Sequence, residues 1–342
     1  MGDGVEATAT GRSGSPRAAG GYGPGSPAGT AVAAEPYPPL GPEPAAGAYP
    51  PLAAGTADLA GLAQRYGLAV SGARPSLADY ARQVWGRRHF IRTFASSKLA
   101  AQYTTARLGQ VWQVVTPLIN AAVYFLIFGV LLGTHRGIDN YIAYLCVGVF
   151  LFNFTQQAVQ AGTRSIPNNL TLIRALHFPR ASLPVAATIS QLQQLVLSML
   201  VLSGIVLVTG EPLTWRWLLI LPSILLQTIF NAGLVMIVAR LAAKTTDLAQ
   251  LVPFVMRVWM YLSGVFYSTG VVAAHAPHLV VTALNWNPAY VFISLMRHSL
   301  MTSVPAHDLP GHLWVKAAAW ALIVGAGGFA FFWHAEEEYG RG

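Results

Sequence analysis

Charged residues are scarce in this sequence. Only 10% of its 342 residues are Asp, Glu, Lys or Arg, whereas about 25% are charged in an ordinary soluble domain. After Gln110 the apolar residues collect into runs of roughly 20 or more, the length that an α-helix needs to cross about 30 Å of hydrocarbon. The shortage of charge therefore excludes an ordinary soluble domain and predicts an all-α integral membrane protein with several spans.

Cysteine and an apolar leader are also lacking. The single cysteine, Cys146, excludes an internal disulfide and leaves the redox compartment open. The N-terminus has no apolar core of the kind found in secretory signal peptides. Residues 1–75 are instead rich in Ala, Gly and Pro and are expected to form a disordered cytoplasmic tail. Its two YPPL repeats, at 37–40 and 49–52, are either docking sites for a proline-recognition module or plain spacer.

The expected spans contain no Asp, Glu or His, because all 13 acidic residues and all nine histidines lie outside them. A proton- or sodium-coupled transporter needs such groups along its path, and a membrane-embedded hydrolase needs a general base or a metal cluster. The sequence also has no Gly-Lys dipeptide and therefore no phosphate-binding loop. We expect no catalytic residue, metal or cofactor in this chain. If ATP drives it, ATP and Mg²⁺ bind to a separate ATPase subunit.

The distribution of Lys and Arg predicts the orientation of six spans. Ten such residues precede the first span, and the loops at 163–181 and 240–250 carry five more, whereas the opposite loops at 134–140 and 210–216 carry one each. Positive residues stay on the cytoplasmic side, so both termini are expected in the cytoplasm and the protein in the plasma membrane. The transmembrane domain, 111–334, has expected spans at 111–133, 141–162, 182–209, 217–239, 251–274 and 313–333, and a cytoplasmic tail follows at 335–342.

Residues 76–110 are predicted to form an amphipathic helix in the cytoplasmic membrane interface. Ser76 and Asp79 fit a capping box, and Gly86 is expected to bend the helix. A soluble helix packed on another surface is the alternative. The net charge of +8 fits cytoplasmic loops that face anionic headgroups rather than a nucleic-acid partner. The apolar side of the helix consists of Leu77, Tyr80, Val84, Ile91 and Phe94.

Residues 275–312 combine an apolar run with a break. The uncharged segment 279–296 is long enough to be a seventh span. However, Pro288 follows Asn287 near its middle and removes a helical hydrogen bond that lipid cannot replace. We therefore predict two short helices that dip in from the outer face without crossing.

The loop between the second and third spans carries a short amphipathic helix, expected at about 165–178. Pro167 suits its start and Pro179 its end. Such a helix is either a handle for an ATPase or a plain interfacial helix with positive-inside arginines, and the residues alone favour neither. The candidate contact residues are Leu170, Ile173, Arg174, Leu176, His177, Phe178, Pro179 and Arg180.

Aromatic residues are dense on the first, second and fifth spans. Flat rings can line a path through the membrane with many weak contacts, although aromatic belts at the membrane interface produce similar counts. Arg257 is the one charge clearly inside a span, where it either binds a phosphate group or extends to the cytoplasmic interface. The candidate channel residues are Tyr124, Phe125, Phe128, Phe150, Phe152, Arg257, Trp259 and Tyr261.

Several short motifs occur in the order found in one transporter family. Over residues 77–338 the chain resembles the permease subunit of ABC exporters for polysaccharides, which include the O-antigen, wall teichoic acid and actinobacterial galactan exporters. Thr104 is a departure, because the family often has a basic residue there. The matching residues are Leu108, Gly109, Trp112, Pro117, Leu172, Ile173, Phe178, Pro179, Arg180, Leu183, Pro184, Asn287, Pro288 and Arg297.

The resemblance implies a bacterial half-transporter that forms a homodimer and binds two copies of an ABC ATPase. The segment 165–178 would then be the coupling helix, and the dimer would enclose a channel for a polyprenyl-linked glycan. An ABC permease for a drug or lipid shares the architecture without needing the helix at 76–100. A membrane scaffold without transport is the third hypothesis. The outer gate implied at 275–312 would include Asn285, Trp286, Asn287, Pro288 and Arg297.

Overall fold

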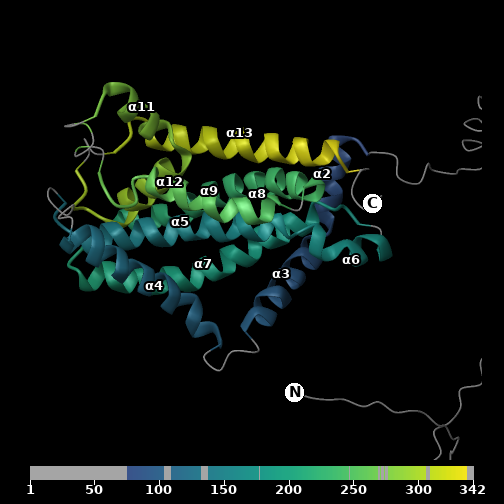
Figure 1. Ribbon diagram of the computed structural model, residues 1–342, viewed down its shortest axis with the longest axis horizontal. Helices are drawn as coiled ribbons and strands as arrows, with labels where there is room; N and C mark the ends of the chain where they lie inside the picture. The colour runs from purple at the N-terminus through teal and green to yellow at the C-terminus, as the bar shows by residue number, and fades with distance from the viewer. Residues whose placement is uncertain are drawn as a thin grey trace, which may run out of the picture. The chain divides into compact units, whose positions relative to one another are not determined.

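The computed structural model shows a chain built from helices, with no strand among the residues that it describes (Figure 1). The all-α fold class is thus confirmed for these residues, which all belong to one compact unit at 68–342. Residues 1–74, most of the predicted N-terminal tail, lie outside them. The described residues are 75–103, 109–131, 138–176, 178–245, 247–268, 270, 273, 276–305 and 309–336.

Four helices are long and apolar enough to cross a membrane, and they coincide with the predicted second, third, fourth and sixth spans. Pro184 lies in the first turn of one of them, where a missing N–H breaks no helical hydrogen bond. The four are α5 (Tyr141–Thr163), α7 (Ser182–Val208), α8 (Ile220–Lys244), which continues the 3-10 helix η4 (Trp215–Leu219), and α13 (Leu313–His334).

The predicted first and fifth spans contain shorter helices. The 3-10 turn η1 (Gly109–Val111), α4 (Trp112–Tyr124) and the π-helix η2 (Phe125–Leu131) follow one another in the first. The helix α9 (Leu248–Tyr261) occupies the start of the fifth. By length and composition the described residues therefore hold four membrane-crossing helices, or up to five if a bent pair counts as one, rather than the six predicted spans.

The bent pair is α11 (His278–Trp286) and α12 (Pro288–Leu300), which meet at an angle of 73°. The break falls at Asn287, where the sequence places it. Pro288 occupies the first turn of α12, a position that suits proline because no intrahelical partner awaits its N–H. The geometry fits a broken span or a re-entrant loop, so the re-entrant arrangement stays a prediction.

Among the described residues, the predicted fifth span is not one continuous helix. The helix α9 ends at Tyr261, and residues 262–268 form turns and bends. Gly264 has a φ of 60°, in the left-handed region that favours glycine. A Cβ at Gly264 would also lie 2.5 Å from Cδ2 of Tyr290 on α12. Gly264 therefore lies in the segment after α9 at a position where the ring of Tyr290 leaves no room for a side chain.

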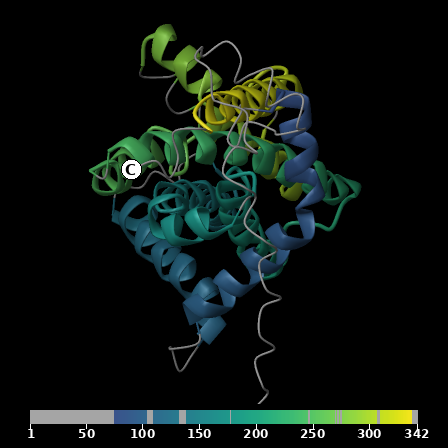
Figure 2. The same cartoon turned by 90° about the vertical axis from the view of Figure 1, so that its right-hand side faces the viewer.

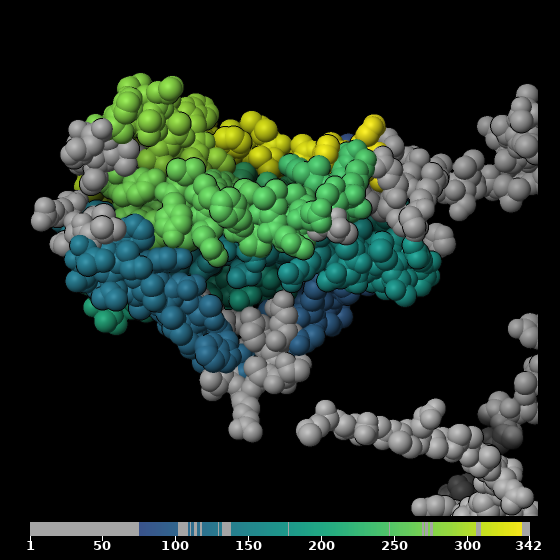
Figure 3. Space-filling model, viewed as in Figure 1, coloured from purple at the N-terminus to yellow at the C-terminus, as the bar shows by residue number. Residues whose placement is uncertain are grey.

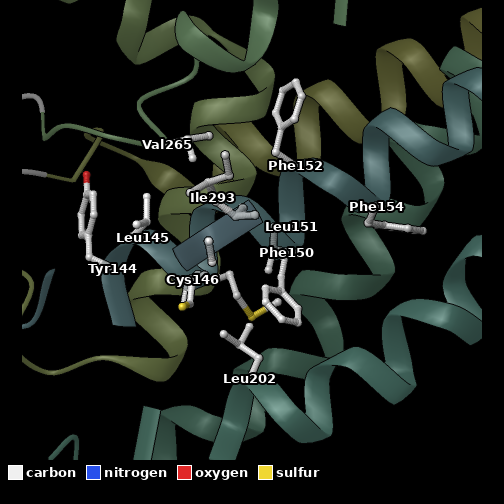
Figure 4. Packing of buried hydrophobic residues seen from close by; sticks show 14 of the residues in the cluster. Tyr144, Leu145, Cys146, Phe150, Leu151, Phe152, Phe154, Leu202, Val265 and Ile293 are labelled. Carbon is white, nitrogen blue, oxygen red and sulfur yellow. The ribbon is translucent and has the colours of Figure 1, made fainter. Parts of the chain in front are cut away.

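The helix α5 is the most enclosed of the long helices. Of its most apolar stretch 78% is buried, against 33% or less in each of the other three. It packs against α4, α7, α8, α9 and α12, and Figure 4 shows Leu145, Phe150 and Leu151 in a core shared with Leu202 of α7 and Ile293 of α12. A helix that is apolar on most of its sides is stable in this position because five other helices pack around it.

The predicted amphipathic helix is divided into α2 (Leu77–Gly86) and α3 (Arg88–Tyr103). The hydroxyl of Ser76 accepts a hydrogen bond of 3.2 Å from the backbone N–H of Asp79, as the capping-box pattern predicts. The break at Gly86 is also where the sequence predicts a bend.

The apolar side of α2 and α3 packs onto the rest of the domain. Tyr80 and Ile91 are buried, Val84 and Phe94 are half-buried, and Leu77 remains exposed. The helix α2 contacts α13, and α3 contacts α7. Figure 2 shows the two helices descending along one side of the domain from the end of α13.

The domain has two ends that carry different features. The helix α2, the short helix α6 (Leu170–Ala175) and the last turn of α13 lie at one end in Figure 1, and α11 lies at the other. We call these the inner end and the outer end, after the orientation predicted from the positive residues.

The helices α8 and α13 approach each other through glycines. A Cβ on Gly328 would lie 2.2 Å from the backbone oxygen of Gly233, and a Cβ on Gly233 would lie 2.0 Å from that of Val324. Small residues allow such close backbone contact between membrane helices, where packing rather than water exclusion drives association.

We expect Gly328→Leu to lower the free energy of unfolding by about 1–3 kcal/mol, the usual cost of overfilling a packed interior. Gly327→Leu is the matched control, because a Cβ at Gly327 meets nothing within 4 Å. Thermal unfolding of the two purified variants in detergent gives the comparison. Equal midpoints would contradict the close approach of α8 and α13.

Candidate functional site

The predicted loop helix is present at the inner end but is short. It consists of the 3-10 turn η3 (Pro167–Asn169) and α6, so it does not fill the predicted range 165–178. Pro167 lies in the first turn, as predicted. Leu176 is already extended, so the helix ends before Pro179 can stop it.

Three of the predicted contact residues are accessible to a partner. Leu170 and Leu176 are 38% and 52% exposed, and Arg174 between them is exposed as well. Two apolar side chains flanking a cation can contact a partner surface that has an apolar groove and a carboxylate. We call Leu170, Arg174 and Leu176 the open side of the loop.

The other described contact residues face the domain instead. Ile173 is buried in a cluster with α2, α8 and α13, and the ring of Phe178 lies 5.6 Å from that of Phe90 on α3. Pro179 is also buried. The helix α6 thus ends at Ala175, and Phe178 beyond it lies against α3. His177 lies outside the described residues.

Arg180 is bound to a residue that the sequence analysis did not single out, Glu336 beyond the end of α13. The backbone N–H of Arg180 donates to the carboxylate at 3.0 Å, and its guanidinium donates to the backbone oxygen of Glu336. The hydroxyl of Tyr80 donates to the same carboxylate at 2.6 Å. Burial raises the pKa of Glu336 above its usual range, although the hydrogen bonds from Arg180 and Tyr80 act in the opposite direction.

Two of the predicted channel residues are enclosed within the chain. Phe150 and Phe152 are 2% and 1% exposed, and both lie in the core around α5 (Figure 4). The ring of Phe152 meets that of Trp259 edge to face at 5.9 Å. These contacts hold α5 against α9, so neither phenylalanine opens onto a path along this chain.

Three other channel candidates meet around Phe266, in the segment that follows α9. The ring centroids of Tyr124, Phe128 and Tyr261 lie 5.0, 4.3 and 5.5 Å from that of Phe266. This aromatic cluster joins α4 and η2 to α9, whose surfaces adjoin on the face shown in Figure 3. The density of aromatic residues in this part of the sequence was the only signal for Phe266.

Arg257 is exposed on α9 on the same side as Tyr261, which lies four residues further along the helix. Two more candidates are half-buried: Phe125, whose ring lies 6.3 Å from that of Tyr141, and Trp259. The structure therefore places the exposed side chains of Arg257 and Tyr261 on one side of α9. We call the surface of α4, η2 and α9 that holds Tyr124, Phe128, Arg257, Tyr261 and Phe266 the aromatic face.

Asn287 ties the break between α11 and α12 to α9. Its side-chain oxygen accepts hydrogen bonds from the indole of Trp259 at 3.0 Å and the backbone N–H of Ala289 at 3.1 Å. Its side-chain nitrogen donates to the carbonyl of Leu262 at 2.9 Å. The predicted gate residue thus fixes the bend directly to the end of the helix that carries Arg257.

The end of α11 is held against α13. The ammonium of Lys316 lies 5.1 Å from the ring of Trp286 and donates to the backbone oxygen of Asn285 at 3.4 Å. The indole of Trp320 donates to the backbone oxygen of Trp286 at 3.1 Å. Two predicted gate residues are therefore anchored on the last long helix.

Arg297 is 1% exposed and binds the backbone where α9 has ended. Its guanidinium donates to the carbonyls of Gly264 and Val265 at 2.9 Å each and of Tyr144 at 3.0 Å, and it stacks 3.2 Å from the centroid of the Tyr144 ring. A Cβ on Gly148 would lie 2.8 Å from the guanidinium, so the glycine leaves room for it.

Two tyrosines of α5 complete this arrangement. The hydroxyl of Tyr141 donates to the carbonyl of Phe266 at 3.1 Å, and that of Tyr144 donates to the carbonyl of Tyr267 at 2.9 Å. Side chains thus replace the helical hydrogen bonds that residues 262–268 have lost. The sequence analysis missed both tyrosines, for which the only signal was a polar-tipped pair three residues apart on an apolar helix.

The outer connections meet at a buried carboxylate, Glu211. It accepts a hydrogen bond of 2.8 Å from the backbone N–H of Thr302 and another from the hydroxyl of Ser303. Burial raises the pKa of Glu211, but hydrogen bonds from Ser303 and Thr302 outweigh it and hold the pKa below its usual value. Within the described part of the chain, no three His, Cys, Asp or Glu side chains come together to hold a metal ion.

Comparisons with known proteins give one family. The profile of the ABC-2 type transporter family matches residues 90–301, more than half of the chain. The chain is 25% identical over 204 residues to the O-antigen export system permease protein RfbA of Myxococcus xanthus, which covers 60% of this chain and 78% of that protein. It is 22% identical over 226 residues to the protein of that name from Klebsiella pneumoniae, a match that covers 66% of this chain and 85% of that protein.

We expect Arg297→Leu to destabilise the protein severely, because each buried carbonyl left without a donor costs about 1–3 kcal/mol. Arg297→Lys should recover part of the loss, since its smaller ammonium keeps the charge but not the three-way geometry. Arg257→Leu, at an exposed position, is the control. Thermal unfolding in detergent measures all three, and an unchanged midpoint for Arg297→Leu would refute the role of these hydrogen bonds.

Proposed function

The chain belongs to the ABC-2 type transporter family, and from this premise we propose that it is the membrane subunit of an ATP-driven exporter of a polyprenyl-linked polysaccharide. One observation carries the proposal. Relatives that are named O-antigen export permeases match this chain over 76% or more of their own length. The cargo is a glycan of the galactan, teichoic acid or O-antigen-like class, carried across the plasma membrane of a bacterium.

The ATPase is a separate subunit. Members of this family normally work with an ABC ATPase. We assign two copies of that ATPase, with their ATP and Mg²⁺, to a homodimer of this chain, each against the open side of one loop. Leu170 and Leu176 supply apolar contacts and Arg174 a cation, while Ile173 and Phe178 fasten the loop to the domain.

The path for the cargo follows the aromatic face, which a second copy of the chain covers. Arg257 supports this assignment, because a charged side chain exposed on an apolar helix is costly against lipid and acceptable beside water. The rings of Tyr124 and Tyr261 offer flat surfaces to sugars. The guanidinium of Arg257 suits a phosphate of the lipid carrier.

We expect the double variant Leu170→Asp, Leu176→Asp to bind its ATPase at least about tenfold more weakly. Because the two leucines are only 38% and 52% exposed before binding, together they contribute about the burial of one whole leucine, roughly 1.5–3 kcal/mol, and 1.4 kcal/mol is a factor of ten in affinity. Leu213→Asp, at a leucine 71% exposed in the connection between α7 and η4, is the control. Co-purification of the ATPase with each variant is the measurement. Undiminished binding by the double variant would remove the loop from the interface.

We expect Arg257→Ala to lower glycan export at least about tenfold, because a hydrogen bond to a charged group contributes about 1.5–3 kcal/mol. Arg257→Lys should keep part of the activity. Cells that lack their own permease are complemented with each variant, and the glycan at the cell surface is measured at equal protein levels. Full export by Arg257→Ala would place the path elsewhere, and export of a hydrophobic drug or lipid without any glycan would favour a permease of that class.

A further inference from the structure

The inner end contains a hydrogen-bonded joint between three segments that are far apart in the sequence. Tyr80 of α2 donates its hydroxyl hydrogen to the carboxylate of Glu336, and the same hydroxyl oxygen accepts the backbone N–H of Ala181 at 3.0 Å. Arg180 binds Glu336 through its backbone and its guanidinium. One phenol and one carboxylate thus connect α2, the end of the loop that carries α6, and the chain after α13. We call Tyr80, Arg180 and Glu336 the inner joint.

A second contact binds α2 to α13 nearby. The indole of Trp333, in the last turn of α13, donates to the carbonyl of Pro75 at 3.0 Å. The ring of Tyr80 also lies 5.6 Å from that of Phe329 on α13. The start of α2 therefore contacts α13 at two positions, through Pro75 and through Tyr80.

Apolar packing surrounds the same place. Ile173 of α6 lies in one buried cluster with Tyr80 of α2, Met236 of α8 and Phe332 of α13. Buried packing of this density transmits displacement instead of absorbing it. A force applied to the open side of the loop therefore acts on α2 and α13 as well as on α5 and α7, the two helices that the loop connects.

We propose that the inner joint makes α6, α2 and the end of α13 move as one rigid body, so that Tyr80 and Glu336 couple ATP hydrolysis to export without touching the ATPase. The two side chains are positioning residues. The route continues through the structure, because α13 packs on α12 and α12 carries Arg297, which holds the chain after α9. Without the joint, a push on the loop would lose its hydrogen-bonded route to α2 and α13 and would depend on α5, α7 and the apolar packing around Ile173.

Burial at this site supports a permanent contact. Tyr80 is among the most completely buried side chains of the described residues. The carboxylate of Glu336 is partly buried and accepts hydrogen bonds from both Tyr80 and Arg180. Separating a buried polar group from its hydrogen-bond partners costs free energy. The inner joint therefore favours movement of the three segments together over sliding of one segment past another.

The inference rests on the proposed function and is tested with the full chain in complex with its ATPase. Tyr80→Phe removes only the hydroxyl, and Glu336→Gln removes the charge and replaces one of the two acceptor oxygens with an NH2 group, so it also removes one hydrogen bond of the joint. Asp79→Asn is the matched control, because Asp79 neighbours Tyr80 but forms an exposed ion pair with Arg82. ATPase binding, ATP hydrolysis and glycan export are measured for each variant.

We expect both joint variants to bind the ATPase normally and to hydrolyse ATP, with export per ATP hydrolysed reduced about fivefold or more, a typical size for coupling between sites. The Asp79→Asn control should keep the ratio of the unmodified protein. A loss that was merely structural would lower hydrolysis and export together. Unchanged ratios in both joint variants would overturn the inference.

A covalent replacement provides the second test. Tyr80→Cys and Glu336→Cys are combined with Cys146→Ala, since Cys146 is the only native cysteine, and the pair is joined with a short thiol crosslinker. A rigid joint predicts low export per ATP before crosslinking and recovery after it. Failure to recover, or a further loss, would show that the segments must separate. Undiminished ATPase binding by the Leu170→Asp, Leu176→Asp double variant would contradict the assignment of the loop to the ATPase, which belongs to the proposed function, whereas unchanged ratios in the joint variants contradict the joint alone.

Discussion

The hydrogen bonds from Arg297 to the interrupted backbone after α9 are the interaction on which the outer half of this domain depends. A chain in a membrane must pair its carbonyls internally because lipid offers no donor. The helix α9 nevertheless stops at Tyr261, and Arg297 supplies donors to Gly264 and Val265. Because the guanidinium of Arg297 lies against α5, residue 148 must be small, and it is a glycine. The helix α5 also lies close enough for Tyr141 and Tyr144 to reach the same segment.

The end of α9 at Tyr261 also explains why Phe266 belongs to the aromatic face. A straight helix would carry Phe266 away from α4, whereas the bend returns its ring to Phe128 and Tyr124. Asn287 fixes the bend between α11 and α12 to the same point of α9. Features at the two ends of the domain are connected by α13, which contacts α2 at the inner end and α12 near Arg297. The proposed export depends on such a connection, because ATP hydrolysis is assigned to the inner end and release of the glycan to the outer end.

Features that depend on neighbours in the sequence were predicted well. Ser76 caps α2, Gly86 ends it, Pro167 begins the loop turn and Pro288 begins α12, each for a reason that lies within a few residues. Features that depend on distant neighbours were not. Nothing near Phe150 indicates that five helices enclose α5, and nothing near Gly264 indicates that Tyr290 lies against it. Glu336, which the sequence offered only as part of an acidic tail, became a buried ligand of Tyr80 and Arg180.

The sequence by itself determined that this is an all-helical membrane protein, where its four longest helices lie and where the outer pair breaks. Helix length against membrane thickness and the missing N–H of proline are local constraints that act within one segment of the chain. Only the tertiary structure decided which aromatic rings are enclosed, which side of the loop remains open and which side chains replace lost backbone hydrogen bonds. These outcomes depend on groups such as Arg297 and Tyr144, which are 153 residues apart in the chain and meet only after folding.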